Sequence, residues 1–183
     1  MNDFFLADDL SGALDAATAF HDAGRTVRIA LSLEAEIEAD EGDVIGYTKE
    51  TRNVSPDDAA AVVMRAMERC RAGGGRLLYK KIDSTLRGPV AAELAALMAA
   101  VPRARILFSP ANPRVGRTVR DGVLRVHGVP VAETEFARDP VGPGRESAIV
   151  RLLGAPATER VVIADAETEA DLIVVQATGL LNE

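Results

Sequence analysis

The sequence predicts an α/β fold: a mostly parallel sheet with helices on both faces, a Rossmann-like three-layer arrangement, with a β-hairpin appendage. Apolar runs of strand length alternate with longer segments of helical period, which is the pattern of βα units. Hydrophobic residues make up 48% of the 183 residues and charged residues 27%, the balance of an ordinary globular protein. A chain of this length suits one core, so we expect a single domain over residues 1–183.

The strands are expected where short apolar runs end in turn residues or polar clusters. Six are predicted, at residues 4–7, 27–31, 44–47, 77–82, 105–108 and 160–163. Residues 123–131 alternate apolar and polar around His127-Gly128, which predicts the hairpin beside the main sheet.

The first two helices follow the first and third strands. One is predicted over residues 14–23. The other spans residues 56–72, with Ser55 as N-cap and Pro56 at the first helical position. The glycine run at 73–75 is interpreted as the end of this helix and not as a phosphate loop.

Two further helices lie in the second half. Residues 88–100 open with Gly-Pro and are rich in Ala and Leu, which favours a helix. A last helix from Glu169 is indicated by Thr168 and Asp171, which are spaced as in a capping box. Residues 173–175 could equally form a strand, because they are β-branched.

Charge and cysteine content limit the partners and the compartment. A net charge of -7 repels nucleic acid and anionic membranes unless positive residues gather on one face, so neither is expected as a partner. Cys70 is the only cysteine, which excludes an intramolecular disulfide, and its helical spacing predicts a packed, inert thiol. No signal-peptide pattern and no run of roughly 18 apolar residues is present, so we expect a cytoplasmic protein.

Polar clusters stand at the carboxyl ends of four predicted strands, where open α/β sheets place ligands. The first cluster is residues 7–13 (ADDLSGA). Asp8 and Asp9 follow a buried strand and precede a helix, and such a pair can accept hydrogen bonds from hydroxyls, deprotonate one, or hold a metal. The alternative is that Asp9 or Ser11 only caps the helix.

The strongest cluster is residues 80–89 (KKIDSTLRGP), which predicts a small-anion site. Lys81 and Asp83 are two residues apart at the end of a strand and should point to the same side. Ser84, Thr85 and Arg87 follow immediately, next to a helix start whose N–H groups and dipole favour negative charge. A capping role needs one such residue and not this many convergent donors.

The other two clusters are weaker. Residues 47–52 offer Arg52, whose guanidinium can hold a carboxylate with two hydrogen bonds, although a solvated arginine is commoner. Residues 110–122 carry three arginines in a loop punctuated by Pro and Gly. That loop could close over an anion or could be an exposed turn.

Several common motifs are missing. Neither G-x-x-x-x-G-K-[ST] nor G-x-G-x-x-G after a strand occurs, so we expect no nucleotide phosphate loop, and a Rossmann-like enzyme with another cofactor is disfavoured. His21 and His127 lack metal-ligand spacing, so no metal site is expected. Ser84 has no histidine that the sequence marks as its base, and no G-x-S-x-G elbow occurs.

Taken in order, four motifs resemble the N-terminal domain of the four-carbon acid sugar kinase family: ADDLSGA, TKETR, YKKIDSTLRG and PANPRVGRTVRDG. The resemblance covers nearly the whole chain. It implies a domain that binds a small anionic sugar acid, while a separate C-terminal domain binds ATP with Mg. Family members phosphorylate threonate, erythronate or 3-oxo-tetronate at the terminal hydroxyl.

The resemblance also implies roles for particular residues. Asp8, Asp9 and Ser11 would face the polyol hydroxyls, and one of the two aspartates would be the catalytic base. The residues implied to surround the substrate are Arg52, Lys81, Asp83, Ser84 and Arg87. The sequence departs from the family pattern at Ser11, Pro89 and Asn112, where Thr, Asn and an aromatic residue are usual, and the last two put the substrate specificity in doubt.

The family's nucleotide-binding domain does not follow within these residues, so no cofactor is expected to bind this chain alone. Three interpretations stay open: a domain of a longer kinase, a split kinase whose partner chain binds ATP, or a stand-alone, non-catalytic sugar-acid binding or regulatory module. A homodimer is compatible with all three.

Overall fold

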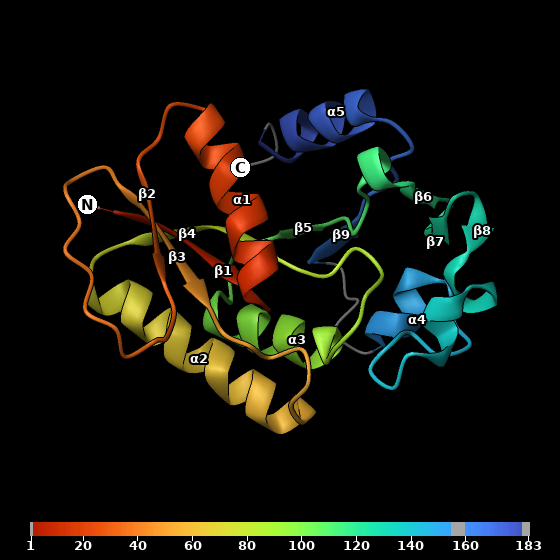
Figure 1. Ribbon diagram of the computed structural model, residues 1–183, viewed down its shortest axis with the longest axis horizontal. Coiled ribbons are helices and arrows are strands. Elements are labelled where there is room, and N and C mark those ends of the chain that lie inside the picture. The colour runs from red at the N-terminus through yellow and green to blue at the C-terminus, as the bar shows by residue number, and fades with distance from the viewer. Residues whose placement is uncertain (1, 155–159, 181–183) are drawn as a thin grey trace. The chain divides into compact units, whose positions relative to one another are not determined.

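Figure 1 shows the computed structural model, which describes residues 2–154 and 160–180, with side chains to residue 174. The chain divides into two compact units. The first ends at Asp83 and the second begins at Ser84, and each is described by itself.

The first unit is a four-stranded parallel sheet with strand order β2-β3-β1-β4. Helix α1 joins β1 to β2, and helix α2 joins β3 to β4. The bounds are β1 (Asp3–Ala7), α1 (Leu10–Asp22), β2 (Val27–Ala30), β3 (Val44–Thr48), α2 (Pro56–Ala72) and β4 (Arg76–Lys81).

The two helices cover opposite faces of this sheet, and successive side chains of β1 point to one face and then to the other. Phe5 packs into a buried cluster with the α1 residues Ala13 and Ala16. Phe4 faces the other way: its ring stacks on Tyr47 with centroids 5.9 Å apart and lies against the glycines that follow α2. The strand is therefore buried on both sides, as its apolar sequence predicts.

The pairing of β1 with β4 contains one irregularity. Phe4 is opposite Leu77, but Phe5 is opposite Tyr79, so Leu78 is an extra residue in β4. The strand lies at the edge of the four-stranded sheet, and Leu78 and Tyr79 are exposed.

The second unit contains a parallel pair, β5 with β9, and a three-stranded antiparallel sheet of order β6-β7-β8. Its strands are β5 (Ile106–Phe108), β6 (Arg117–Arg120), β7 (Val123–Val126), β8 (Val129–Pro130) and β9 (Val161–Ile163). Its helices are α3 (Val90–Ala100), α4 (Ile149–Leu153) and α5 (Glu169–Leu180), with single turns η1 (Pro113–Val115), η2 (Val131–Glu133) and η3 (Glu135–Arg138).

The α/β class is confirmed, and all six predicted strands are present. The predicted hairpin corresponds to β7 and β8 joined at His127-Gly128, and its partner β6 was not predicted. Residues 173–175 lie in α5, so their interpretation as a strand is wrong. The first helix begins at Leu10 and not at residue 14, because the Asp9 side chain accepts the Gly12 N–H and caps it.

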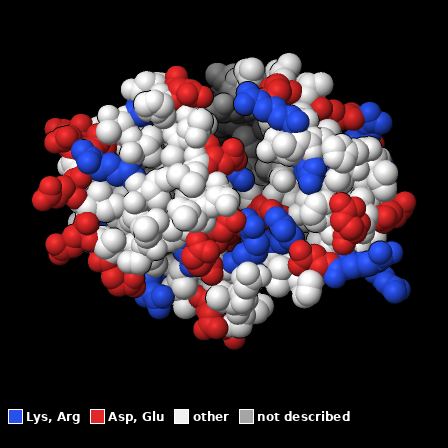
Figure 2. All heavy atoms as spheres, viewed as in Figure 1, with Lys and Arg blue, Asp and Glu red and all other residues white. Residues whose placement is uncertain are grey.

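Charged side chains are spread over the described surface. Figure 2 shows acidic and basic residues interspersed on the face in view. Within the described residues, no helix is both long enough and apolar enough to cross a membrane.

Candidate functional site

The candidate site of the first unit lies where the connections from two neighbouring strands diverge. After β1 the chain turns into α1 on one face of the sheet, and after the adjacent β3 it turns into α2 on the other. Such a point at the carboxyl ends of parallel strands leaves a crevice that α/β proteins use for ligands. Asp8 and Asp9 follow β1, and Arg52 follows β3.

The guanidinium of Arg52 organises this crevice. It donates from Nε and Nη2 to Asp8 Oδ2 at 3.3 and 3.1 Å, and its Nη1 is 2.9 Å from Asp9 Oδ2. Asp83 Oδ1, at the end of β4, is 3.7 Å from Nη2. One cation thus gathers three carboxylates, two that follow β1 and one that follows β4.

The two aspartates differ in whether a carboxylate oxygen is left to accept a hydrogen bond. Both oxygens of Asp9 are engaged, Oδ1 with the Gly12 N–H at 2.7 Å and Oδ2 with Arg52. Asp8 has Arg52 on Oδ2 only, and its Oδ1 is buried without a hydrogen-bond partner among the described residues. A buried, unpaired carboxylate oxygen is costly, and here it faces the start of α1 beside Gly12.

The local backbone explains how Arg52 reaches the aspartates. Glu50 has φ +48°, in the left-handed region, so the chain turns sharply after β3. The Thr51 N–H then donates to the Asp8 carbonyl at 3.0 Å, and Arg52 follows directly. Backbone strain of this kind clusters at functional sites, which agrees with a site here.

The remaining predicted residues of this unit lie nearby or outward. Lys81 Nζ is 3.6 Å from Asp15 on α1, and its Cγ lies next to Gly12. Ser11 is exposed on the first turn of α1. The structure thus brings Asp8, Asp9, Arg52 and Asp83 together and places Lys81 beside Gly12 and Asp15.

Ser84 and Arg87 belong to the second unit. There the Arg87 guanidinium is 3.9 Å from Asp139 and lies 6.0 Å from the ring centroid of Phe136. Leu86 and Gly88 both have positive φ, so this stretch turns tightly before α3. Helix α3 starts at Val90, and Pro89 caps it without a side-chain hydrogen bond.

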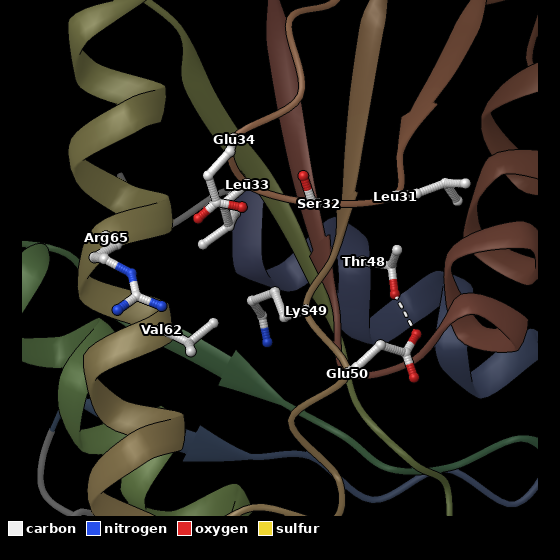
Figure 3. Close-up of a pocket in the computed structure, with 9 residues that line it drawn as sticks. All are labelled: Leu31, Ser32, Leu33, Glu34, Thr48, Lys49, Glu50, Val62 and Arg65. Carbon is white, nitrogen blue, oxygen red and sulfur yellow. Dashed lines mark hydrogen bonds between the residues drawn. The ribbon is translucent and has the colours of Figure 1, made fainter.

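Other residues of the 48–52 motif line a separate depression of about 230 Å³, shown in Figure 3. Thr48 donates to Glu50 at 2.8 Å on one side, and Lys49 and Arg65 stand on the other. Two cations and the two carboxylates Glu34 and Glu50 share this space, so its lining favours neither sign of charge.

The described residues contain no group of three His, Cys, Asp or Glu side chains placed to hold a metal ion. The three carboxylates of the crevice meet at a guanidinium instead.

A model of a sugar-binding N-terminal domain matches residues 4–177. The chain belongs to the four-carbon acid sugar kinase family. The matched residues include all four motifs on which the sequence resemblance depends.

Members of the four-carbon acid sugar kinase family with known names are similar over most of the chain. A D-threonate kinase of Bordetella bronchiseptica is 39% identical over 97% of this chain and 50% of its own length. A 3-oxo-tetronate kinase of Methylobacterium radiotolerans is 32% identical over 90% of this chain and 40% of its own length. The chain thus spans half or less of these curated relatives.

A solved structure of a family member has the same fold. A Bordetella bronchiseptica protein described as a domain of unknown function, with bound citrate and as a domain-swapped dimer, aligns with a TM-score of 0.85 and 39% identity. The alignment covers 97% of this chain and 50% of that one.

Sequence reasoning did not predict that Asp9 caps α1 while Asp8 keeps an unpaired oxygen, or that Gly12 leaves room for Asp9 and Lys81. The spacing D-D-x-x-G was a usable signal, because a glycine three residues after an N-cap aspartate lets the helix start approach neighbouring strands closely.

Proposed function

We propose that residues 1–183 act as the substrate-binding domain of an ATP-dependent kinase for four-carbon sugar acids of the tetronate type. The observation that carries the proposal is the crevice in which Arg52 holds Asp8, Asp9 and Asp83 and leaves Asp8 Oδ1 as a buried, unpaired acceptor. A hydroxyl hydrogen of a polyol is the group that such an oxygen accepts. The family membership and the names of the relatives support the substrate class.

In this proposal Asp8 is the catalytic base and Asp9 is a positioning group. Arg52 fixes Oδ2 of Asp8, so Oδ1 would take the proton from the terminal hydroxyl. The hydroxyl oxygen would then bond to the γ-phosphorus of ATP while the bond from that phosphorus to the ADP oxygen breaks and ADP leaves. Phosphoryl transfer depends chiefly on positioning and charge, so one well-placed acceptor is sufficient on this side of the reaction. ATP and Mg would be held by residues outside this chain.

The other predicted residues stay in the proposal as substrate ligands. Lys81 and Arg87 supply positive charge for the sugar carboxylate, Asp83 accepts a hydroxyl hydrogen, and Ser11 and Ser84 can donate. Their support is the motif resemblance together with the position of Asp83 and Lys81 at the end of β4.

Direct binding of sugar acids tests the proposal. We expect D-threonate, D-erythronate or 3-oxo-tetronate to raise the Tm of the chain, and isothermal calorimetry to give a stoichiometry of one. Citrate is a useful further ligand, because the Bordetella protein binds it. The absence of binding by every four-carbon acid would overturn the assignment.

Two isosteric variants separate the aspartates. Asp8→Asn removes the charge of the proposed base and should abolish phosphorylation while it lowers affinity only moderately. Asp9→Asn should weaken both, because it disturbs the cap of α1 and the hold on Arg52. Asp22→Asn, at the exposed far end of α1, is the matched control.

A non-catalytic binding or regulatory module is the second candidate. It is favoured by the missing nucleotide phosphate motif. Mixing the chain with the separately produced nucleotide-binding half of a relative decides between the two. Sugar-acid-dependent ATP consumption in the mixture supports the kinase, and binding without turnover in every such mixture supports the module.

Self-association belongs to the same set of experiments. The Bordetella structure is a domain-swapped dimer. We propose that this chain also forms a homodimer, and sedimentation equilibrium with and without sugar acid would measure it.

A further inference from the structure

The three arginines of the loop after β5 and of β6 have different surroundings. Arg114 pairs with Glu169 at 2.9 Å, and Arg120 pairs with Glu167, so both are tied to the residues around the start of α5. Arg117 contacts no carboxylate of the described residues. Its Nη1 donates to the Val115 carbonyl, and its guanidinium lies 5.3 Å from the ring centroid of Phe136.

The Arg117 guanidinium is left incompletely satisfied. Its Nε is buried and has no hydrogen-bond acceptor among the described residues. Leaving one buried donor without a partner costs about 1–3 kcal/mol, and a charged donor costs more. Native proteins retain few such groups, and each one calls for a physical explanation such as a missing ion or ligand.

A second guanidinium contacts the same ring. Arg87 lies 6.0 Å from the Phe136 centroid and 3.9 Å from Asp139 Oδ2. Asp139 also accepts the Val141 N–H on Oδ1, so this carboxylate has a structural task of its own. Two guanidinium groups therefore lie beside one aromatic ring, and the Asp139 carboxylate lies near that of Arg87.

The ring of Phe136 explains how the Arg117 guanidinium is held without a carboxylate of the described residues beside it. The face of an aromatic ring carries partial negative charge and attracts guanidinium groups, and stacking fixes the plane of the guanidinium. A fixed guanidinium loses less conformational entropy when it binds an oxyanion with two parallel hydrogen bonds.

We propose that Arg117, held on the ring of Phe136, forms an oxyanion-binding site in the second unit, with its Nε as a principal donor. Its ligand is a carboxylate or phosphate group of a small molecule. The site goes beyond the proposed function, since Arg117 and Phe136 have no part in the Asp8 crevice. The competing explanation is that Arg117 only packs β6 against η3.

Nuclear magnetic resonance of the Arg117 Nε–Hε group tests the proposal directly. The intact chain is titrated with inorganic phosphate, and separately with acetate and with D-threonate. We expect this resonance to move saturably with at least one of them. Saturation by phosphate alone identifies a phosphoryl group as the ligand, and saturation by the carboxylates alone identifies a carboxylate.

Two variants and one control complete the test. Arg117→Gln and Phe136→Leu should each weaken oxyanion binding about tenfold or more, the loss expected for one charge-assisted hydrogen bond and its support. Arg114→Gln removes an equal charge from the same loop, where Arg114 is already paired with Glu169, and should leave binding unchanged.

Stability without anion separates ligand binding from packing. If Arg117 serves a ligand, Arg117→Gln should leave the Tm of the anion-free protein unchanged or raise it, because an unsatisfied charge is removed. A lower Tm together with unchanged oxyanion affinity would overturn the proposal. An unmoved Arg117 resonance in the wild-type titrations would do so without any variant.

The outcome is distinguishable from that of the sugar-acid proposal. Asp8→Asn should disturb the binding of sugar acids and leave the phosphate response of Arg117 in place. A chain that binds no sugar acid but still shows a saturable Arg117 shift would contradict the proposed function and support this inference.

Discussion

At the residue scale, the first turn of α1 is shaped by the missing side chain of Gly12. A Cβ at this position would lie 2.8 Å from Asp9 Oδ1 and 3.2 Å from Lys81 Cγ. We expect Gly12→Ala to displace Asp9 and to weaken sugar-acid binding about tenfold or more, measured by calorimetry.

Stability should change little in Gly12→Ala, since alanine gains up to about 1 kcal/mol of helix propensity that offsets part of the overlap. Ala19→Gly, on the exposed side of the same helix, is the control for propensity. It should lower the Tm and leave affinity intact, and an equal loss of affinity in both variants would contradict the steric explanation.

Cys70 gives a second prediction at this scale. The side chain is 1% exposed, and burial raises the pKa of its thiol to about 11. The thiolate is the reactive form, so Ellman's reagent at pH 8 should react slowly with the native chain and rapidly in denaturant. Because Cys70 is the only cysteine, the signal needs no assignment, and a fast native reaction would refute the prediction.

Single residues were predictable where the position in a strand decides the outcome. Asp8, Asp9, Asp83 and Arg52 stand at strand ends in the sequence, and strand ends of a parallel sheet meet at one edge. The sequence could not show that both oxygens of Asp9 have partners while Oδ1 of Asp8 has none. That difference depends on the position of Arg52, which follows a left-handed turn at Glu50.

At the element scale, the N-terminus of α2 is defined by Ser55. Its Oγ accepts the Asp58 N–H at 3.2 Å, as the sequence predicted. We expect Ser55→Ala to destabilise the chain by about 1 kcal/mol, measured by chemical denaturation. Ser55→Asp keeps an acceptor and should cost less, so similar losses in both variants would argue against capping as the cause.

The pairing of β2 with the start of β3 gives a prediction about pH. Arg28 Nε donates to Asp43 Oδ2 at 2.7 Å, and this hydrogen bond lowers the pKa of the Asp43 carboxyl below its ordinary value. A carboxyl with a lowered folded-state pKa stabilises the fold above its unfolded pKa, near 3.9, and this contribution is lost as pH falls through the folded value.

Asp43→Asn should therefore lower the Tm at pH 7, and the difference from wild type should shrink toward pH 3. The control is Asp43→Asn introduced into the Arg28→Gln variant. There the loss of Tm at pH 7 should be smaller, because the ion-pair partner of Asp43 is already gone. A Tm difference that is constant between pH 7 and pH 3 would rule out the ion pair as its source.

Elements were predicted well where periodicity is strong and poorly where capping or pairing decides. Helix α2 was predicted with its observed bounds, because Ser55, Pro56 and the glycine run mark both ends. The predicted start of helix α1 was four residues too late, since its first turn is made of cluster residues whose side chains suggested chemistry. Strand β6 was missed because its sequence, RTVR, contains two arginines and no apolar run, and its pairing with β7 leaves no mark in the sequence.

At the scale of the whole molecule, net charge governs solubility. The chain carries -7 at pH 7 and has an isoelectric point near 5.0. Self-repulsion vanishes at the isoelectric point, so the concentration of polyethylene glycol needed for precipitation should be lowest near pH 5 and higher at pH 7.

The exposed Glu36 offers a variant for this test. Glu36→Lys replaces a negative charge by a positive one, which raises the net charge by two, and should move the minimum to higher pH without a change in Tm. A minimum that stays in place would point to an apolar surface and not to charge as the cause of precipitation.

The fold class of the whole chain followed from the alternation of strand and helix patterns, and it is confirmed. The sequence did not predict that the parallel strands divide into a sheet of four and a pair. Hydrophobic runs indicate that a strand is buried, but they carry no information on which strands share hydrogen bonds.

The extra residue in β4 has a consequence for the two adjacent lysines. Partners in a parallel pair face the same side, and Ala7 is opposite Lys81 only because Leu78 shifts the count by one. Without the extra residue, Ala7 would be opposite Lys80, so Lys80 would face α1 and Lys81 would face α2. The length of β4 thus decides which lysine lies beside Gly12. We therefore expect this strand to tolerate the substitution of a residue more readily than the insertion or deletion of one.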